Sequence, residues 1–292
     1  MLRPTESTFE GLPDYPFFPH YVEVAEGLRM HYVDEGNPQD PVVLLLHGEP
    51  SWSFLYRKMI PGLVAARFRV IAPDLIGFGK SDKYVEQEAY TYQRHIDWLK
   101  QFLLVLDLQA IHLFCQDWGG LLGLRVVTEL PDRFAKIVAS NTGLPTGKYP
   151  PSPAFEQWLT FSQTSESFPI SRVIQMGVTQ TLTSEVLAAY DKPFPSEAHK
   201  GGARRFPALV PTQPDDPEAQ RNLEAWKFLS TWEKPFLTIF GSKDWVTKGG
   251  EKFFIRSIPG AQGQPHDILE AGHFIQEEAG EELVQRLIPF FR

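Results

Sequence analysis

The chemistry of this chain centres on Asp117, which follows the apolar run IHLFCQ and precedes Trp118 and two glycines. An apolar run that ends in small residues is typical of a strand turning sharply into a helix. In the related G-x-S-x-G turn, a serine at the tip exposes its oxygen and is backed by the N–H of the following residue. Here an aspartate replaces that serine, so we expect Asp117 to be a nucleophile.

An aspartate nucleophile favours one kind of substrate, because a serine alkylated at a saturated carbon becomes an ether that water does not easily cleave. An alkylated aspartate is an ester, and water can attack its acyl carbon, releasing an alcohol and restoring the carboxylate. Asp117 therefore indicates displacement at an sp³ carbon followed by hydrolysis. The alternative is structural, since aspartate is also a favoured N-cap for the helix that begins near Trp118.

Composition and charge narrow the class of protein. The 292 residues are 42% hydrophobic, enough for a large globular core, and the length fits one α/β core with an inserted subdomain. The formal net charge of −8 argues against a nucleic acid partner, because phosphates are bound by clustered Lys and Arg. No apolar stretch approaches the roughly 20 residues that span a bilayer, and the N-terminus lacks a secretory apolar region. We expect no membrane association and a cytoplasmic location.

Cys115 is the only cysteine, which excludes an internal disulfide and a cysteine-based metal cluster. It lies on the strand two residues before the turn, where we expect it to pack as a small buried residue rather than react as a thiol. The histidines show no metal-ligand spacing either. We therefore expect neither a metal nor an organic cofactor.

Hydrophobic patterning predicts a mostly parallel sheet. Residues 22–36 alternate apolar and polar positions around a glycine, which predicts an antiparallel hairpin at a sheet edge. Short apolar runs, typical of strands covered on both faces, lie in 41–50, 67–79, 111–120, 134–143, 234–245 and 266–274. Helical spacing in 90–108 and 118–130 supplies the alternation of a βαβ sheet, and 281–291 suits a closing helix.

The strand pattern breaks after Gly143. From Pro145 to about Trp226 the sequence is rich in Pro, Ser, Thr and Phe and contains only short helix-like segments. We expect residues 144–226 to form a helical cap inserted into a core built from 1–143 and 227–292. Ligands of open parallel sheets bind beyond the carboxyl ends of the strands, so the loops there should build the site.

The sequence HGEP, from His47 to Pro50, forms a tight turn directly after the run VVLLL. Hydrolases with a nucleophile turn of this kind take one oxyanion-stabilising N–H from such a loop and another from the residue after the nucleophile. Those donors would be the main-chain N–H groups of Glu49 and Trp118. The alternative is an ordinary turn, in which Glu49–Pro50 is a candidate for a cis bond.

His273, after the last predicted strand, is the candidate general base, since a histidine held by a carboxylate can deprotonate water near neutral pH. Asp244, after the run FLTIF, would orient His273 and stabilise the imidazolium. A structural histidine at a helix start and a plain turn acid are the alternatives. The competing place for the acid, after FAKIVAS, holds Asn141, which cannot carry the charge.

The chain order of nucleophile, second acid and histidine is that of α/β-hydrolases. Together with the strand pattern, this order predicts the α/β class, with an α/β-hydrolase core whose mostly parallel sheet is flanked by helices, plus the inserted helical cap.

Four strings, HGEPSWSFLYRKMIP, DLIGFGKSDK, CQDWGG and AGHFIQE, together resemble the haloalkane dehalogenases that use Asp, His and a late Asp, over both halves of the core. The resemblance implies that Asp117 is the nucleophile, His273 the base and Asp244 its partner. It also implies two halide-binding indoles. These would be Trp118 and, as the only tryptophan between Gly143 and Trp226, Trp158.

An indole N–H is a donor without an acceptor, which suits a departing halide. Phe155 and Phe161 flank Trp158 and would line a pocket for a small apolar halogenated substrate. Trp158 has a structural alternative, which is to fill the core between cap and sheet. The further partners that the resemblance implies are water and the halide product, and we expect a monomer.

Three other functions share parts of this pattern. An epoxide hydrolase typically has a histidine before the nucleophile and two cap tyrosines, whereas this chain has Gln116 and offers Tyr149 and Tyr190. A fluoroacetate dehalogenase would have an arginine just after the nucleophile, where this chain has Trp118. The third is a non-catalytic α/β-hydrolase-like protein that captures a small apolar ligand, and the complete set of two acids and a histidine argues against it.

Overall fold

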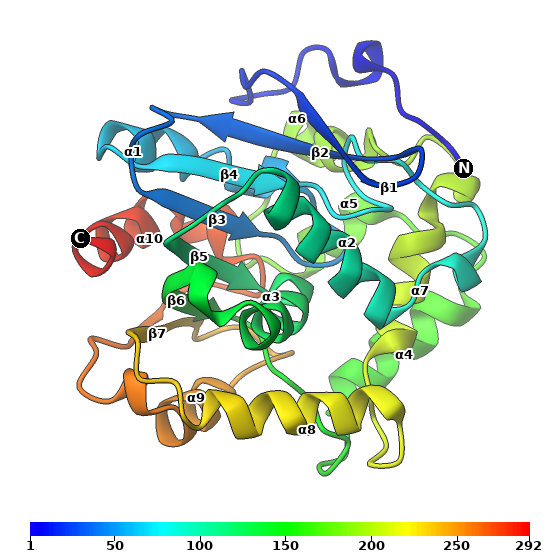
Figure 1. The fold of residues 1–292 in the computed structure, drawn as a ribbon. Helices are drawn as coiled ribbons and strands as arrows, with labels where there is room; N and C mark the ends of the chain where they lie inside the picture. Colours follow the sequence, from blue (N-terminus) through cyan, green and yellow to red (C-terminus); the bar gives the residue numbers. More distant parts are fainter.

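An eight-stranded sheet in the order β1-β2-β4-β3-β5-β6-β7-β8 forms the centre of the computed structural model, which describes all 292 residues (Figure 1). The strands are β1 (His20–Ala25), β2 (Leu28–Glu35), β3 (Val42–Leu46), β4 (Arg69–Pro73), β5 (Ile111–Gln116), β6 (Phe134–Ser140), β7 (Phe236–Gly241) and β8 (Asp267–Leu269). The pairs β1–β2 and β2–β4 are antiparallel, and all others are parallel. The predicted edge hairpin and mostly parallel sheet are therefore confirmed.

Ten α-helices surround the sheet. They are α1 (Ile60–Ala65), α2 (Tyr92–Val105), α3 (Trp118–Glu129), α4 (Pro153–Thr164), α5 (Ile170–Met176), α6 (Ser184–Asp191), α7 (Gly201–Leu209), α8 (Pro217–Leu229), α9 (Glu251–Ser257) and α10 (Ile275–Phe291). Helix α1 packs against α10, while α2 and α8 both pack against α3. Because helices cover the central strands, all six residues of β5 are buried.

The helices of the predicted cap follow β6 and precede β7. Figure 1 shows α4 and α7 beyond the arrowheads of β3 and β5, where the carboxyl ends of the parallel strands lie. Side chains of the cap helices, such as Ile174 of α5 and Phe206 of α7, join the same buried cluster as the sheet. Helix α8 ends at Leu229, three residues past the expected boundary at 226, and packs on α3. The division into cap and core remains a prediction.

Strand register brings the loops of the site together. Cys115 of β5 pairs with Leu46 of β3, and Gln116 pairs with Ser140 of β6. The residues that follow these strands therefore meet at one edge of the sheet. Gly241 of β7 pairs with Leu269 of β8 in the same way, which places the loops after β7 and β8 side by side.

The first turn of α10 is tied to the core by a buried ion pair. Glu277 accepts hydrogen bonds from both terminal nitrogens of Arg57, one of them at 2.8 Å, and both side chains are buried. Tyr190 of α6 donates to the same carboxylate. Burial alone would raise the pKa of Glu277, but these bonds outweigh burial and lower it. Helix α10 begins at Ile275, earlier than its predicted start, so this contact fixes the segment directly after His273.

Arg57→Ala should lower the free energy of unfolding by about 3–5 kcal/mol, because it leaves the Glu277 carboxylate buried without its main partner. Urea denaturation would measure the loss. Lys227→Ala is the matched control, because Lys227 pairs with Glu224 at the surface, and its expected effect is within about 0.5 kcal/mol. An Arg57→Ala loss below about 1 kcal/mol would show that Lys58, 3.4 Å from Glu277 Oε2, is a sufficient partner.

Candidate active site

Asp117 sits at the turn between β5 and α3 in a backbone conformation that is unusual for a non-glycine residue, with φ 50° and ψ −123°. Its N–H donates to Asn141 O at 3.1 Å, and Thr142 Oγ1 donates to its carbonyl at 2.7 Å. The side chain makes no capping bond to α3. Instead, Glu49 N–H donates to Asp117 Oδ1 at 2.8 Å. The purely structural N-cap interpretation is therefore wrong.

Two glycines make room for this turn. A Cβ at Gly48 would overlap the carboxylate of Asp117, and a Cβ at Gly119 would overlap the carbonyl oxygen of Leu46. The HGEP turn and the nucleophile turn thus approach each other more closely than any larger residue would allow.

The HGEP turn is itself held by a neutral histidine. His47 Nδ1 donates to Gly48 O at 2.9 Å, and Nε2 accepts from Leu75 N–H at 2.9 Å. Burial lowers the pKa of His47, which favours this neutral form. The Glu49–Pro50 bond is cis. His47 therefore has a structural role, which is to fix the loop that presents Glu49 N–H.

The side chain of Glu49 is a feature that the sequence did not reveal. It is buried, lines the cavity beside Asp117, and its Oε1 has no hydrogen-bond partner. Burial and the nearby charge of Asp117 raise its pKa well above the usual value for a glutamate. Glu49 therefore holds its proton in conditions where an exposed glutamate is ionised.

His273 and Asp244 form a buried pair at the ends of β8 and β7. His273 Nδ1 lies 3.1 Å from Asp244 Oδ2, and His273 Nε2 lies 3.5 Å from Asp117 Oδ2. Asp244 also accepts hydrogen bonds from Val246 N–H, at 2.8 Å, and from the hydroxyl of Thr247. Burial raises the pKa of Asp244, but His273 and these donors outweigh it and lower the pKa. The alternative of a plain turn acid is thereby excluded.

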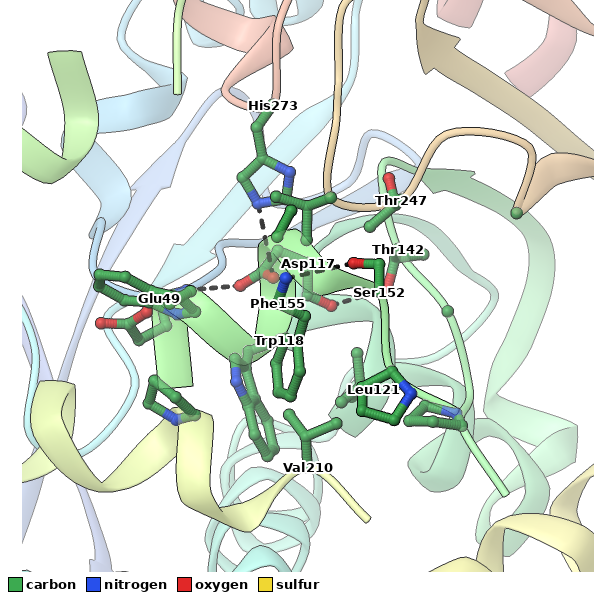
Figure 2. Close-up of a pocket in the computed structure, with 18 of the residues that line it drawn as sticks. Glu49, Asp117, Trp118, Leu121, Thr142, Ser152, Phe155, Val210, Thr247 and His273 are labelled. Atoms are coloured by element: carbon green, nitrogen blue, oxygen red, sulfur yellow. Dashed lines mark hydrogen bonds and ion pairs between the residues drawn. The ribbon is translucent and has the colours of Figure 1, made fainter. Parts of the chain in front are cut away.

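The two acids on either side of His273 govern its protonation. Burial alone would lower the pKa of His273, but the charges and hydrogen bonds of Asp244 and Asp117 raise it to about 10. In the free protein the imidazole is therefore protonated at neutral pH. Figure 2 shows His273 and Glu49 approaching the Asp117 carboxylate from two sides.

Asn141 has a role that the sequence did not predict. At the position of the competing acid, its Nδ2 donates to the carbonyls of Gly272 and His273, each at 2.9 Å, and its Oδ1 accepts from Gly241 N–H. The amide thus joins the loops after β6, β7 and β8. An aspartate there could not donate to the two carbonyls, so the amide is the better choice for holding the His273 backbone.

A cavity of 790 Å³ opens in front of Asp117. It is lined by all the candidate residues except Asp244, namely Glu49, Asp117, Trp118, Phe155, Trp158, Phe161 and His273. In Figure 2, Trp118, Leu121 and Val210 lie together on one side of the carboxylate. The only other charged side chain that lines the cavity is Arg172 of α5. The interior is thus mainly apolar, and its charged side chains are Asp117, His273 and Arg172.

Four tryptophans line the cavity, which are Trp118, Trp158, Trp226 and Trp245. Trp226 uses its indole N–H within the protein, donating to Leu144 O at 2.8 Å, whereas Trp118 and Trp158 do not. Trp158 packs beside Phe161 and the buried Phe168, with ring centroids 6.0 and 5.5 Å away. The half-exposed Trp245 has no acceptor for its indole N–H either. The indole N–H groups of Trp118 and Trp158, which are less exposed, are therefore free to donate to an anion inside the cavity.

The side chains that would support epoxide opening, thiol catalysis or metal binding do not come together at the cavity. Tyr190 is buried with its hydroxyl on Glu277 and does not line the cavity, which leaves Tyr149 as the only tyrosine there. Cys115 is buried, and burial raises the pKa of its thiol. No group of three or more His, Cys, Asp or Glu side chains is arranged to hold a metal ion, and no helix is long and apolar enough to cross a membrane.

The fold and the site place the chain among the α/β hydrolases, and a family model described as the alpha/beta hydrolase fold matches residues 41–280. Within that class, the chain belongs to the haloalkane dehalogenase family. It is 52% identical to a haloalkane dehalogenase of Psychrobacter cryohalolentis and 48% identical to one of Mycolicibacterium paratuberculosis. Both alignments cover 99% of this chain and 97% of the relative. The predicted resemblance is confirmed.

Solved structures agree with this assignment. The tetrameric haloalkane dehalogenase DpaA from Paraglaciecola agarilytica NO2 is 39% identical with a TM-score of 0.90, over 98% of this chain and 96% of that one. A putative ancestral haloalkane dehalogenase is 25% identical with a TM-score of 0.82, over 93% of this chain and 98% of that one.

Asp117→Asn should lower the pKa of His273 from about 10 by about 1–3 units, because it removes one of the two charges that stabilise the imidazolium. NMR titration of the labelled histidine ring would measure the shift. Asp132→Asn is the matched control, since Asp132 is exposed on the surface. An unchanged pKa in Asp117→Asn would contradict the charge coupling between the two side chains.

Proposed function

We propose that this protein hydrolyses haloalkanes to a primary alcohol and a halide ion through an ester on Asp117. The observation that carries the proposal is the Asp117 carboxylate, which faces an apolar cavity with Oδ1 bound to Glu49 N–H and Oδ2 beside His273. The membership of the chain among the haloalkane dehalogenases supports the same reaction.

In the first step, Asp117 Oδ2 attacks the carbon that bears the halogen. A C–O bond forms while the carbon–halogen bond breaks, and the halide leaves with the bonding electron pair. The free indole N–H groups of Trp118 and Trp158 would stabilise the departing anion. Fixed donors aimed at developing charge are most effective in a site from which water is excluded.

In the second step, a water molecule attacks Cγ of the Asp117 ester and passes a proton to His273 Nε2. The negative charge that develops on the acyl oxygen is stabilised by Glu49 N–H and by Trp118 N–H. The latter is the first amide of α3 and so lacks an intrahelical acceptor. The tetrahedral intermediate expels the alkoxide, which takes the proton from His273 and leaves as the alcohol. Asp117 then ionises, so one proton is released for each halide.

The charge of Asp117 sets the timing of these steps. Asp244 and Asp117 together hold His273 protonated in the free protein. Alkylation neutralises Asp117, which removes one of these stabilising charges and lowers the pKa of His273. Since only a neutral imidazole can accept a proton from water, formation of the ester increases the fraction of His273 that can act as a base. The Nε2 proton that the ring loses passes to solvent, and the ring recovers a proton from the Asp117 carboxylic acid at the end of the cycle.

Asp117→Ala should abolish halide release from 1,2-dibromoethane or 1-bromobutane, because the only other carboxyl in the cavity, Glu49, is buried and its raised pKa keeps it from acting as a carboxylate nucleophile. His273→Gln should release at most one halide per protein and retain the alkyl group on Asp117, which mass spectrometry of the peptide would detect. Asp132→Asn, which alters an exposed acid, should keep its activity. Repeated turnover by His273→Gln would show that another group activates the water.

The same assay distinguishes the closest rival function. An epoxide hydrolase would open styrene oxide without releasing halide from the bromoalkanes. The cavity is lined by one tyrosine rather than two, which disfavours protonation of an epoxide oxygen by a tyrosine pair. Turnover of any kind would rule out a protein that only binds ligands.

Trp158→Phe should weaken bromide binding about ten- to a hundredfold, because a charged hydrogen bond contributes about 1.5–3 kcal/mol. Quenching of tryptophan fluorescence would give the bromide affinity. Trp226→Phe is the matched control, since Trp226 lines the same cavity but its N–H is already bound to Leu144. Equal effects of the two substitutions would contradict the assignment of Trp158 as the second halide donor.

We further propose that Phe155 and Phe161 contact the apolar part of the substrate, since both line the cavity. We also propose that the protein acts as a cytoplasmic monomer. Light scattering on the purified protein would test the monomeric state, which is of interest because the structure of the relative DpaA is described as tetrameric.

A further inference from the structure

Gln116 is a buried amide whose contacts converge on one residue. It is the last residue of β5 and precedes Asp117, and its side chain is completely buried. Its Nε2 lies 3.2 Å from the main-chain oxygen of His273 and 3.2 Å from His273 Nε2. An amide nitrogen has two hydrogens, so it can donate to both atoms at once when His273 Nε2 carries no proton. Its Oε1 has no partner.

The contact with the carbonyl fixes which way the amide points. If the amide were turned over, Oε1 would face the carbonyl oxygen of His273, and two acceptors would oppose each other without a hydrogen. The N–H groups of Gln116 must therefore face His273. An N–H can donate to His273 Nε2 only when that nitrogen is unprotonated, because a protonated imidazole nitrogen has no lone pair to accept.

We propose that Gln116 is a positioning residue that favours the neutral form of His273, with its proton on Nδ1, during hydrolysis of the ester. In this form Nδ1–H donates to Asp244 and Nε2 accepts from Gln116. When Nε2 is protonated, two N–H groups face each other and neither has an acceptor there, which is costly in a buried site. This inference rests on the proposed ester mechanism.

Gln116 and Asp117 therefore act on the Nε2 proton in opposite directions. In the free protein the charge of Asp117, together with that of Asp244, outweighs the effect of Gln116 and keeps the ring protonated. Once Asp117 is esterified, Gln116 still opposes protonation. Gln116 does not line the cavity, whereas His273 and Asp117 do. The amide thus contacts the ring from within the protein and leaves the cavity side open to the attacking water.

The other groups that bear on the protonation of His273 are all unchanged by a substitution of Gln116. They are Asp117, Asp244 and the protonated Glu49 around the ring, Arg172 across the cavity, and Glu278, which accepts from Gly272 N–H at 2.6 Å. A change in the pH dependence of the Gln116 variants therefore reports the amide itself.

The test is the rate of ester hydrolysis as a function of pH in Gln116→Met, which keeps a similar shape but cannot donate. Rapid mixing with 1-bromobutane, acid quenching and mass spectrometry would follow the decay of the Asp117 ester. Loss of the bond should raise the midpoint of the pH profile by about half to one unit. At a pH below the midpoints of both proteins, Gln116→Met should hydrolyse the ester about three to ten times more slowly than the wild type. The rate of ester formation should change less.

Asn141→Gly is the matched control, because Asn141 donates to the same His273 carbonyl but does not touch the ring. Glycine also accepts the positive φ of 39° at this position. A looser His273 backbone should slow hydrolysis at every pH without moving the midpoint. Gln116→Leu provides a second variant that lacks the donor if Gln116→Met folds poorly, and its midpoint should rise as well.

The possible results separate this inference from the proposed function. If wild-type protein releases halide without forming an ester on Asp117, the proposed function itself fails. If the ester forms and decays but the midpoint in Gln116→Met or Gln116→Leu equals that of the wild type, the role of Gln116 is overturned. An equal shift in Asn141→Gly would also overturn it, since the effect would then come from the backbone.

Discussion

The site depends on one backbone conformation, the positive φ of Asp117. That turn directs the carboxylate away from the end of α3, where an aspartate would normally cap, and towards Glu49 N–H and His273. A non-glycine residue in such a conformation costs about 1–3 kcal/mol and persists only where its surroundings hold it. Here the conformation is held by hydrogen bonds between Asp117 and the loop after β6, and by the close packing of this turn at Gly48 and Gly119.

The same loops hold the general base by its main chain. The carbonyl of His273 accepts from Asn141 and Gln116, and its N–H donates to Gly177 O at 2.7 Å. The ring is thus placed by backbone contacts on one side and by Asp244 on the other. Since a proton transfer requires a distance near 3 Å, this rigidity lets a change in charge on Asp117, rather than a movement, alter what His273 does.

The sequence predicted the sheet and the main candidate residues because their signals are local. Apolar runs marked the buried strands, and the residues after them, Asp117, Asp244 and His273, meet because parallel strands end at one edge. The sequence did not predict what depends on distant contacts. The amide of Asn141 appeared to be a poor substitute for an acid, and nothing marked Glu49 as a buried neutral carboxyl or Thr247 as a donor to Asp244. Helices α7 and α8 also lacked a clear pattern.

The predicted cap leaves the sheet after β6 and returns at β7, and these two strands are hydrogen-bonded neighbours. The ends of the insertion are therefore held close together by the sheet, whatever lies between them. Because the entropy of closing a loop grows only slowly with its length, residues can be gained or lost in this segment at little cost to the strands. The chamber that receives the substrate can thus diverge in evolution while the machinery beneath it stays constant.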